Sequence, residues 1–142
     1  MKKLIQFLIS LSLTIGISLC NNPYGKELVF DKTQVFYTSN VSEKEANKFG
    51  IYLIKSEFTD GTAKSVQLDK KSDTYLFRFV MKKEFEKDPS FVRLSRIMGL
   101  ELSNNVFNGS LVEVHWCDKQ FNTFKVVPMM KNLGKNKVFN GT

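Results

Sequence analysis

The 142-residue chain has little of the chemistry that marks enzymes and metal proteins, with one histidine and two cysteines, Cys20 and Cys117. A structural zinc site needs four ligands, and a disulfide framework needs several cysteine pairs, so neither can organise this fold. The eight glycines form no phosphate-binding loop, and no Gly-x-Ser-x-Gly turn presents a nucleophile. We therefore predict no catalytic residue, no metal and no cofactor.

Acidic residues are scarcer than basic ones, with 14 Asp and Glu against 21 Lys and Arg and a formal charge of +7. Removing residues 1–20, which hold Lys2, Lys3 and no acid, lowers this charge to +5. The remaining lysines stand among acids, as in Glu43-Lys44-Glu45, which is typical of a solvated surface. We expect no nucleic-acid partner.

A long apolar run occurs only near the start of the chain. Lys2 and Lys3 precede a mainly apolar stretch over 4–19, and Cys20 ends it. This stretch is shorter than the ~20 residues that span a bilayer and contains several hydroxyls, so it is typical of a cleavable export signal. We predict a signal peptide over 1–20, one domain over 21–130 and a flexible basic tail over 131–142.

The end of the signal is compatible with two kinds of processing. Ile17-Ser18-Leu19-Cys20 resembles the bacterial lipobox, in which the cysteine receives diacylglycerol before a peptidase cuts ahead of it. This resemblance implies lipidation at Cys20 and a membrane-anchored lipoprotein, periplasmic or at the cell surface. The alternative is an ordinary cut after Cys20, with Ser18 and Cys20 as the small residues of the site, which gives a secreted soluble protein.

Start signals and alternating patterns define the elements. Ser42 and Glu45 form a capping box before apolar residues at helical spacing up to Phe58, and Asp88 with Pro89 starts a second helix that ends near Asn108. Extended patterns cover residues 28–30 with 35–38, 65–68, 74–81, 111–116 and 123–128. The order β-α-β-β-α-β-β predicts an α+β fold: an antiparallel sheet with two helices on one face, ferredoxin-like or similar.

A weak internal duplication supports this order. Phe58-Thr59-Asp60-Gly61 is echoed by Phe107-Asn108-Gly109, and the segment 69–75 is echoed by 118–124, both about 49 residues later. Each copy predicts a helix followed by two strands, and a polar turn joins these strands.

Three polar residues of one predicted strand provide the enzyme alternative. Glu113, His115 and Cys117 alternate along the strand, so their side chains share a face and could form a thiolate–imidazole pair. A spacing of two residues is not a recognised nucleophile or metal signature, and no orienting partner is evident. We regard an unreactive thiol and a hydrogen-bonded histidine as the better interpretation.

The sheet surface away from the helices is the candidate binding face. Alternation places Tyr75, Phe77 and Phe79 toward the helices. If the second hairpin repeats the first, the opposite face carries an aromatic, aliphatic and cationic set: Arg78, Val112, Val114, Trp116, Lys125 and Val127. A slip of one residue in that hairpin moves Val112, Val114 and Trp116 into the core instead.

Two resemblances bear on function. The stretch 35–128 is similar to a module of uncharacterised bacterial exported and membrane-attached proteins, through 41–46, Phe58-Thr59-Asp60-Gly61, 65–68 and 74–79. The helix start at 42–46 after a strand more weakly resembles the SPOR domain, a peptidoglycan-binding fold. The first resemblance implies no activity, and the second rests mainly on element order, which does not fix function.

We expect an exported, lipid-anchored, non-catalytic binding module of the cell envelope. Its partner would be a protein, a peptide or an envelope polymer. The alternatives are a small enzyme using His115 and Cys117, and a structural or inhibitory secreted protein that self-associates as a homodimer.

Overall fold

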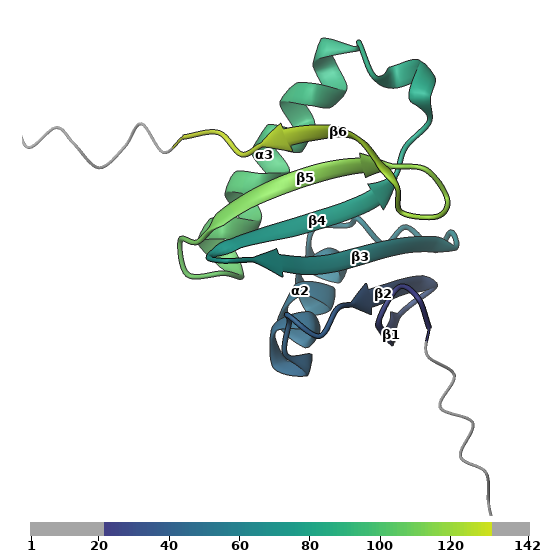
Figure 1. Cartoon of the computed structure of the whole chain (residues 1–142), viewed down its shortest axis with the longest axis vertical. Helices are drawn as coiled ribbons and strands as arrows, with labels where there is room; N and C mark the ends of the chain where they lie inside the picture. Colours follow the sequence, from purple (N-terminus) through teal and green to yellow (C-terminus); the bar gives the residue numbers. More distant parts are fainter. Residues whose placement is uncertain (1–21, 132–142) are drawn as a thin grey trace, which may run out of the picture.

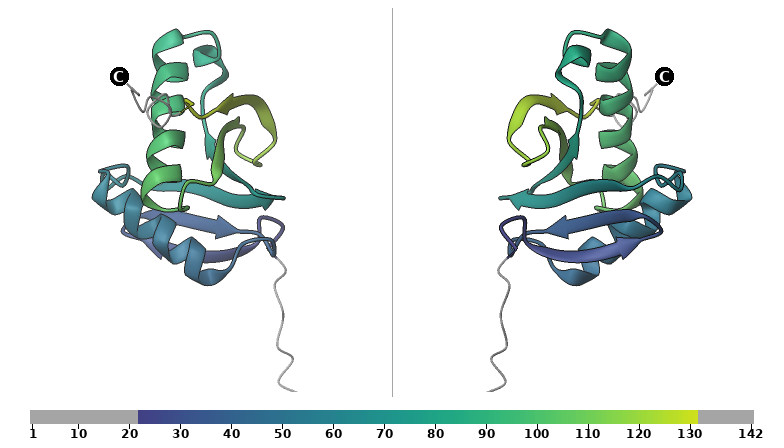
Figure 2. Two further views of the ribbon diagram at one scale, coloured as in Figure 1. Left: turned by 90° about the vertical axis from the view of Figure 1, so that its left-hand side faces the viewer. Right: turned by 90° about the vertical axis from the view of Figure 1, so that its right-hand side faces the viewer.

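Six strands form one sheet, and they stand side by side in the order in which they occur along the chain. The computed structural model describes residues 22–131. The elements are β1 (Lys26–Phe30), β2 (Thr33–Tyr37), α2 (Glu43–Lys55), β3 (Lys64–Lys71), β4 (Thr74–Val80), the 3₁₀ turn η1 (Lys83–Phe85), α3 (Pro89–Asn105), β5 (Leu111–Cys117) and β6 (Thr123–Pro128). Both helices cover the same face of the sheet (Figure 1, Figure 2).

The sheet is mixed, because the chain alternates hairpins with helical crossovers. The pairs β1–β2, β3–β4 and β5–β6 are antiparallel hairpins. The pairs β2–β3 and β4–β5 are parallel, because α2 and α3 return the chain to the end where the previous strand began. Right-handed crossovers that advance in one direction leave both helices on one face of the sheet.

Local hydrogen bonds start both helices at the predicted residues. At α2, the Ser42 hydroxyl accepts the Glu45 N–H at 3.2 Å, and the Glu45 carboxylate accepts the Ser42 N–H at 2.7 Å. At α3, Asp88 accepts the Ser90 N–H at 2.8 Å, and Pro89 occupies the first turn, where no backbone donor is needed. These bonds confirm the capping signals read from the sequence.

The main core lies between the sheet and the helices. The Phe49 ring of α2 packs edge-on to Phe77 of β4, with ring centroids 5.0 Å apart. Tyr75 and Phe77 belong to this core and Phe79 packs against it, as predicted. The other strand residues of the core are Val35, Tyr37, Val66, Leu68, Val112, Val114, Trp116 and Val127.

A smaller cluster covers part of the second face, which we define as the sheet surface opposite the helices. Phe36 of β2 and Cys117 of β5 lie on it, and Phe121, from the turn between β5 and β6, packs over them. Tyr24, ahead of β1, reaches the same place, with its ring 5.2 Å from that of Phe121. Segments from opposite edges of the sheet therefore meet over the second face.

The α+β class with two helices on one face is confirmed, with corrections of detail. The sheet is not wholly antiparallel, since each crossover joins neighbouring parallel strands. The first extended stretch is a hairpin, β1–β2, so the order is β-β-α-β-β-α-β-β. The ferredoxin-like description is not confirmed.

The duplicated segments occupy equivalent places in the fold. Phe58 and Phe107 both follow the end of a helix, and the echoed polar segments both contain the turn of the following hairpin, β3–β4 or β5–β6. The chain is therefore built from two successive α-β-β units, preceded by one hairpin.

Two parts of the predicted organisation lie outside the described residues. They are the signal over 1–20, with Cys20, and the tail apart from Lys131. Between residues 22 and 131, neither helix has the length and apolar character needed to cross a membrane.

Candidate functional site

The predicted binding face is wrong, because most of its members are in the core. Val112, Val114, Trp116 and Val127 are buried, and Trp116 has no exposed surface. The β4–β5 register sets Phe77 beside Val114 and Phe79 beside Trp116, so these side chains share the face covered by the helices. Lys125 pairs with Trp116 on that face, and its ammonium lies 5.4 Å from the indole centroid. Arg78 alone points to the second face.

The error comes from the assumption that the second hairpin copies the first. The β3–β4 hairpin closes with a two-residue turn, because Lys71 pairs with Thr74. The β5–β6 hairpin has a longer turn and a register shift between Trp116 and Cys117. An inserted residue changes which side chains face the core, so the hairpin slip considered as the alternative is the arrangement observed.

Glu113, His115 and Cys117 do share the second face, but they do not form a nucleophile and base pair. The two ring nitrogens of His115 lie 3.1 Å from Thr123 Oγ1 and 3.1 Å from Glu113 Oε2. Cys117 Sγ lies 3.6 Å from Thr123 Oγ1 and is fully buried, and this burial raises the pKa of its thiol. A protonated, enclosed thiol is a poor nucleophile.

Arg78 is the centre of a polar network on the second face. Its Nη1 donates to Gln67 Oε1 at 2.9 Å and lies 3.4 Å from Asp69 Oδ2, while its buried Nε has no partner among the described residues. Gln67 in turn donates to the backbone carbonyl of Tyr24 at 2.8 Å. This network secures the entering chain to the sheet, which is a structural task.

Asp69 completes this network as a carboxylate. Burial alone would raise the pKa of Asp69, but hydrogen bonds from Thr38, Asn40 and the Lys70 N–H, together with the charge of Arg78, hold it below its usual value. The Thr38 hydroxyl donates to Asp69 at 2.5 Å. The hydrogen bonds of the Asp69 carboxylate therefore join β3 to the end of β2.

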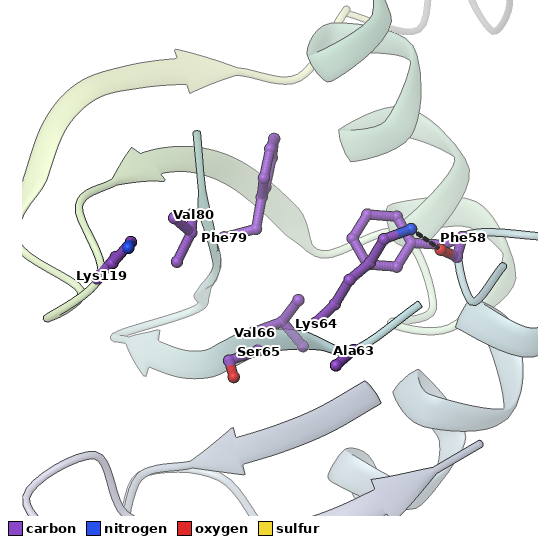
Figure 3. A pocket seen from close by; sticks show the side chains of 8 residues that line it. All are labelled: Phe58, Ala63, Lys64, Ser65, Val66, Phe79, Val80 and Lys119. Atoms are coloured by element: carbon purple, nitrogen blue, oxygen red, sulfur yellow. Dashed lines mark hydrogen bonds between the residues drawn. The ribbon is translucent and has the colours of Figure 1, made fainter. Parts of the chain in front are cut away.

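A cavity opens where β3 and β4 separate, and we call it the fork cavity. The last pair of the β3–β4 ladder is Val66 with Phe79, so Ser65 of β3 and Val80 of β4 lie beyond the paired region. The cavity has a volume of about 610 Å³. Its lining, drawn in Figure 3, is Phe58, Ala63, Lys64, Ser65, Val66, Phe79, Val80 and Lys119.

The fork cavity combines apolar walls with two lysines. Lys64 is held in place, since its Nζ donates to the Phe58 carbonyl and lies 2.8 Å from Asp60 Oδ2, with the Phe58 ring beneath it (Figure 3). Lys119, on the β5–β6 turn, has no ion pair with any described acid. An apolar group carrying negative charge would find both kinds of contact here.

Sequence reasoning missed the fork cavity. The available signal was a difference in length: the apolar alternation of β4 continues to Val80 and Met81, whereas the pattern recognised for β3 begins at Ser65. Strands whose ends diverge leave a gap that neither strand shows by itself. Phe58 was expected at the end of the apolar spacing of the first helix, whereas the structure places it in the loop after α2, under this gap.

Comparison with known proteins identifies a family without an activity. No curated protein and no solved structure matches the chain. The family match extends from β1 to the end of β6 and so includes the fork cavity, both crossover helices and the polar network of the second face. With residues 27–128 matched, the chain belongs to the family described as the AF_1994_N family N-terminal domain.

Proposed function

We propose that this protein is an exported, lipid-anchored, non-catalytic binding module of the cell envelope, and that it binds an extended peptide segment of a partner protein at the fork cavity. The observation that carries this proposal is the separation of β3 and β4 beside an apolar hollow. Strand ends that lack a neighbour on one side can pair there with an added chain, and a hollow beside them can hold one of its side chains.

The side chains around the fork favour a particular peptide. Phe58, Phe79 and Val80 would receive an apolar or aromatic residue, because burying such a residue against them removes apolar surface from water. Lys119 would meet an acidic residue nearby, since its ammonium has no acidic partner among the described residues. The expected ligand is a short extended stretch with an apolar residue beside an acid.

Export and anchoring are part of the same proposal. The apolar run ending at Cys20 and the similarity to bacterial exported and membrane-attached proteins support an envelope location. The weaker SPOR resemblance points to a glycan polymer, but the lining of the fork cavity is aliphatic and aromatic with few polar side chains, which favours a peptide. The enzyme alternative receives no support from Cys117, whose thiol is enclosed.

The test selects ligands from a random peptide library on the protein without residues 1–20. Peptides enriched in the selection are synthesised, and their dissociation constants are measured for the wild type, Val80→Asp and Val29→Asp. Val80 lines the fork cavity, whereas Val29 is an exposed valine of β1 outside it. Val80→Asp should weaken binding at least tenfold, or about 1.4 kcal/mol, and Val29→Asp should not.

Three outcomes would contradict the proposal. One is a selection that enriches no peptide, and another is enriched peptides that bind Val80→Asp as tightly as the wild type. The third is equal weakening by both variants, which would indicate a general effect on the fold. Melting curves of both variants distinguish loss of a contact from loss of structure.

A further inference from the structure

The outer surface of the helical layer is cationic and apolar at once. On α3, Arg93, Leu94, Arg96 and Ile97 all point to solvent, with Leu94 57% and Ile97 37% exposed. The face that α3 turns inward carries Leu102 together with three small residues, Ser95, Gly99 and Ser103. At Gly99 a Cβ would lie 2.9 Å from the Cβ of Met129, so the helix packs closely there, while Leu94 and Ile97 stay on its exposed side.

The second helix adds residues of the same two kinds. Lys44, Lys48, Ile51 and Lys55 recur at spacings of three and four along α2, and so lie on one side of it. All four are exposed, including Ile51 at 48%. The two helices α2 and α3 lie on the same side of the sheet (Figure 2), and both sets are on the exposed sides of their helices. We call these eight residues the helical face.

The cations of the helical face form no ion pair with a described acid. Among residues 22–131, no ion pair involves the five cations of this face, which are Arg93, Arg96, Lys44, Lys48 and Lys55. Glu101, the acid on the exposed part of α3, accepts hydrogen bonds from Tyr52 and Asn105. Five cations therefore stand beside exposed aliphatic side chains.

Positive charge continues past the edge of α3. A hollow of about 500 Å³ beside this helix is lined by Lys87, Arg93, Arg96 and Lys125, together with Pro89, Val92 and Met130. Glu86 is the acidic residue of this lining, and its backbone carbonyl accepts a hydrogen bond from Lys125 at 2.6 Å.

We propose that the helical face docks on the surface of an anionic phospholipid bilayer. Aliphatic residues among arginines and lysines match such a surface, because the apolar side chains enter the headgroup boundary while the cations meet lipid phosphates. A second copy of this chain fits poorly, since two helical faces would bring five cations against five. The proposal does not depend on lipid at Cys20 or on a peptide at the fork cavity.

The test measures binding of the protein without residues 1–20 to vesicles. This protein keeps the whole sheet and both helices, and it carries no lipid, so any binding belongs to the folded chain. Partition onto vesicles of equal parts phosphatidylglycerol and phosphatidylcholine is compared with partition onto pure phosphatidylcholine. Binding should require phosphatidylglycerol and should weaken as salt is added, because salt screens exposed charges.

Matched variants locate the surface. The double variant Arg93→Gln/Arg96→Gln should lower partition onto anionic vesicles about thirtyfold, at roughly a fivefold loss for each cation. The control Lys32→Gln/Lys71→Gln removes the same charge at two hairpin turns and should leave partition within about twofold of wild type. Leu94→Ser should weaken partition severalfold, while Val29→Ser, at an aliphatic residue on β1, should not.

Several results would overturn the proposal. They are absence of binding to anionic vesicles, equal binding to neutral ones, and equal losses from the α3 and turn double variants. Binding to soluble polyglutamate without binding to vesicles would also overturn it, and would assign the helical face to an acidic polymer. A dimer that dissociates in Arg93→Gln/Arg96→Gln would assign it to self-association instead.

Discussion

The indole N–H of Trp116 donates a hydrogen bond to the hydroxyl of Ser95 at 2.9 Å, in the interior between β5 and α3. A buried N–H without a partner would be costly, so this bond makes the position of α3 over the sheet specific. It also explains why α3 buries a serine on its inward face, where an apolar residue would be expected.

Replacing Trp116 by Ala should lower the free energy of unfolding by about 3–5 kcal/mol, because it removes the largest fully buried side chain of the core. Trp116→Phe keeps most of the packing and loses the hydrogen bond, which should cost about 1–3 kcal/mol. Urea unfolding measures both values. A Trp116→Ala protein as stable as the wild type would contradict the buried position.

The protein contains one tryptophan, so fluorescence tests the same position without a mutation. The emission of the native monomer should be shifted to the blue and resist quenching by acrylamide, because water does not reach the indole. Emission typical of a solvated indole would show that β5 has the other register.

The free energy of unfolding should depend on pH through the carboxyl group of Glu45. Burial alone would raise the pKa of Glu45, but hydrogen bonds from Tyr75 and Ser42 and the charge of Lys70 lower it from 4.5 to about 2. A carboxyl with a lowered folded-state pKa stabilises the fold above its unfolded pKa, and this contribution is lost as the pH falls from about 4.5 to about 2.

Glu45→Gln should therefore lower the free energy of unfolding by about 1–3 kcal/mol at neutral pH and by much less at the acid end of that range. Glu84→Gln is the control, since Glu84 is exposed and its ion pair with Lys82 spans 3.7 Å. Urea unfolding at a series of pH values provides the comparison. A Glu45→Gln deficit that stays constant with pH would argue against this role of the carboxylate.

Cys117 should behave as an unreactive thiol. Burial raises its pKa, although Thr123 and Arg78 act in the opposite direction, so little thiolate is present at neutral pH. In the protein without residues 1–20, Cys117 is the remaining cysteine, and iodoacetamide should modify it slowly in the native state and rapidly in urea. Rapid alkylation of the native protein would contradict this prediction and support the alternative of an enzyme that uses Cys117.

Gly50 should not tolerate alanine, although alanine favours helices. A Cβ at Gly50 would lie 2.1 Å from the ring of Phe30, so the ring of β1 would have to leave its place against α2. Gly50→Ala should cost about 1–3 kcal/mol of unfolding free energy. Adding Phe30→Leu should recover part of this loss, and a double-variant cycle measures the coupling.

Cys20 should carry lipid in the bacterial envelope if the lipobox resemblance holds. Growth with a labelled fatty acid should mark the wild-type protein, and Cys20→Ala should be unlabelled and soluble. Cys117→Ala is the matched control and should remain labelled. Label that survives in Cys20→Ala would exclude lipidation at this residue.

The helices could be predicted because their signals are local. Ser42 with Glu45, and Asp88 with Pro89, each act within a few residues, and the structure confirms both starts. The fold class followed from the order of such segments. The parallel pairs could not be predicted, because no local pattern indicates that each crossover helix returns the chain to the place beside the previous strand.

The predicted binding face failed for a physical reason that local patterns cannot reveal. Alternation tells which residues of β5 share a face, but only the partner strand decides which face that is. The pairing of Phe77 with Val114 and of Phe79 with Trp116 decided this choice for β5. Arg78 belongs to the β3–β4 hairpin and lies on the second face as predicted. The other five predicted residues lie on the face covered by the helices.

The aromatic cluster over the second face has a mechanical consequence for a protein held by its N-terminal end. Tension on the entering chain reaches Tyr24 before it reaches β1, and Tyr24 is fixed by Phe36, Phe121 and the hydrogen bond from Gln67. Since β1 pairs with β2 only, a pull acting directly on β1 would break the hydrogen bonds between these two strands one after another. In the lipid-anchored protein that we propose, the cluster would therefore bear a pull on the anchor before the hydrogen bonds of β1 do.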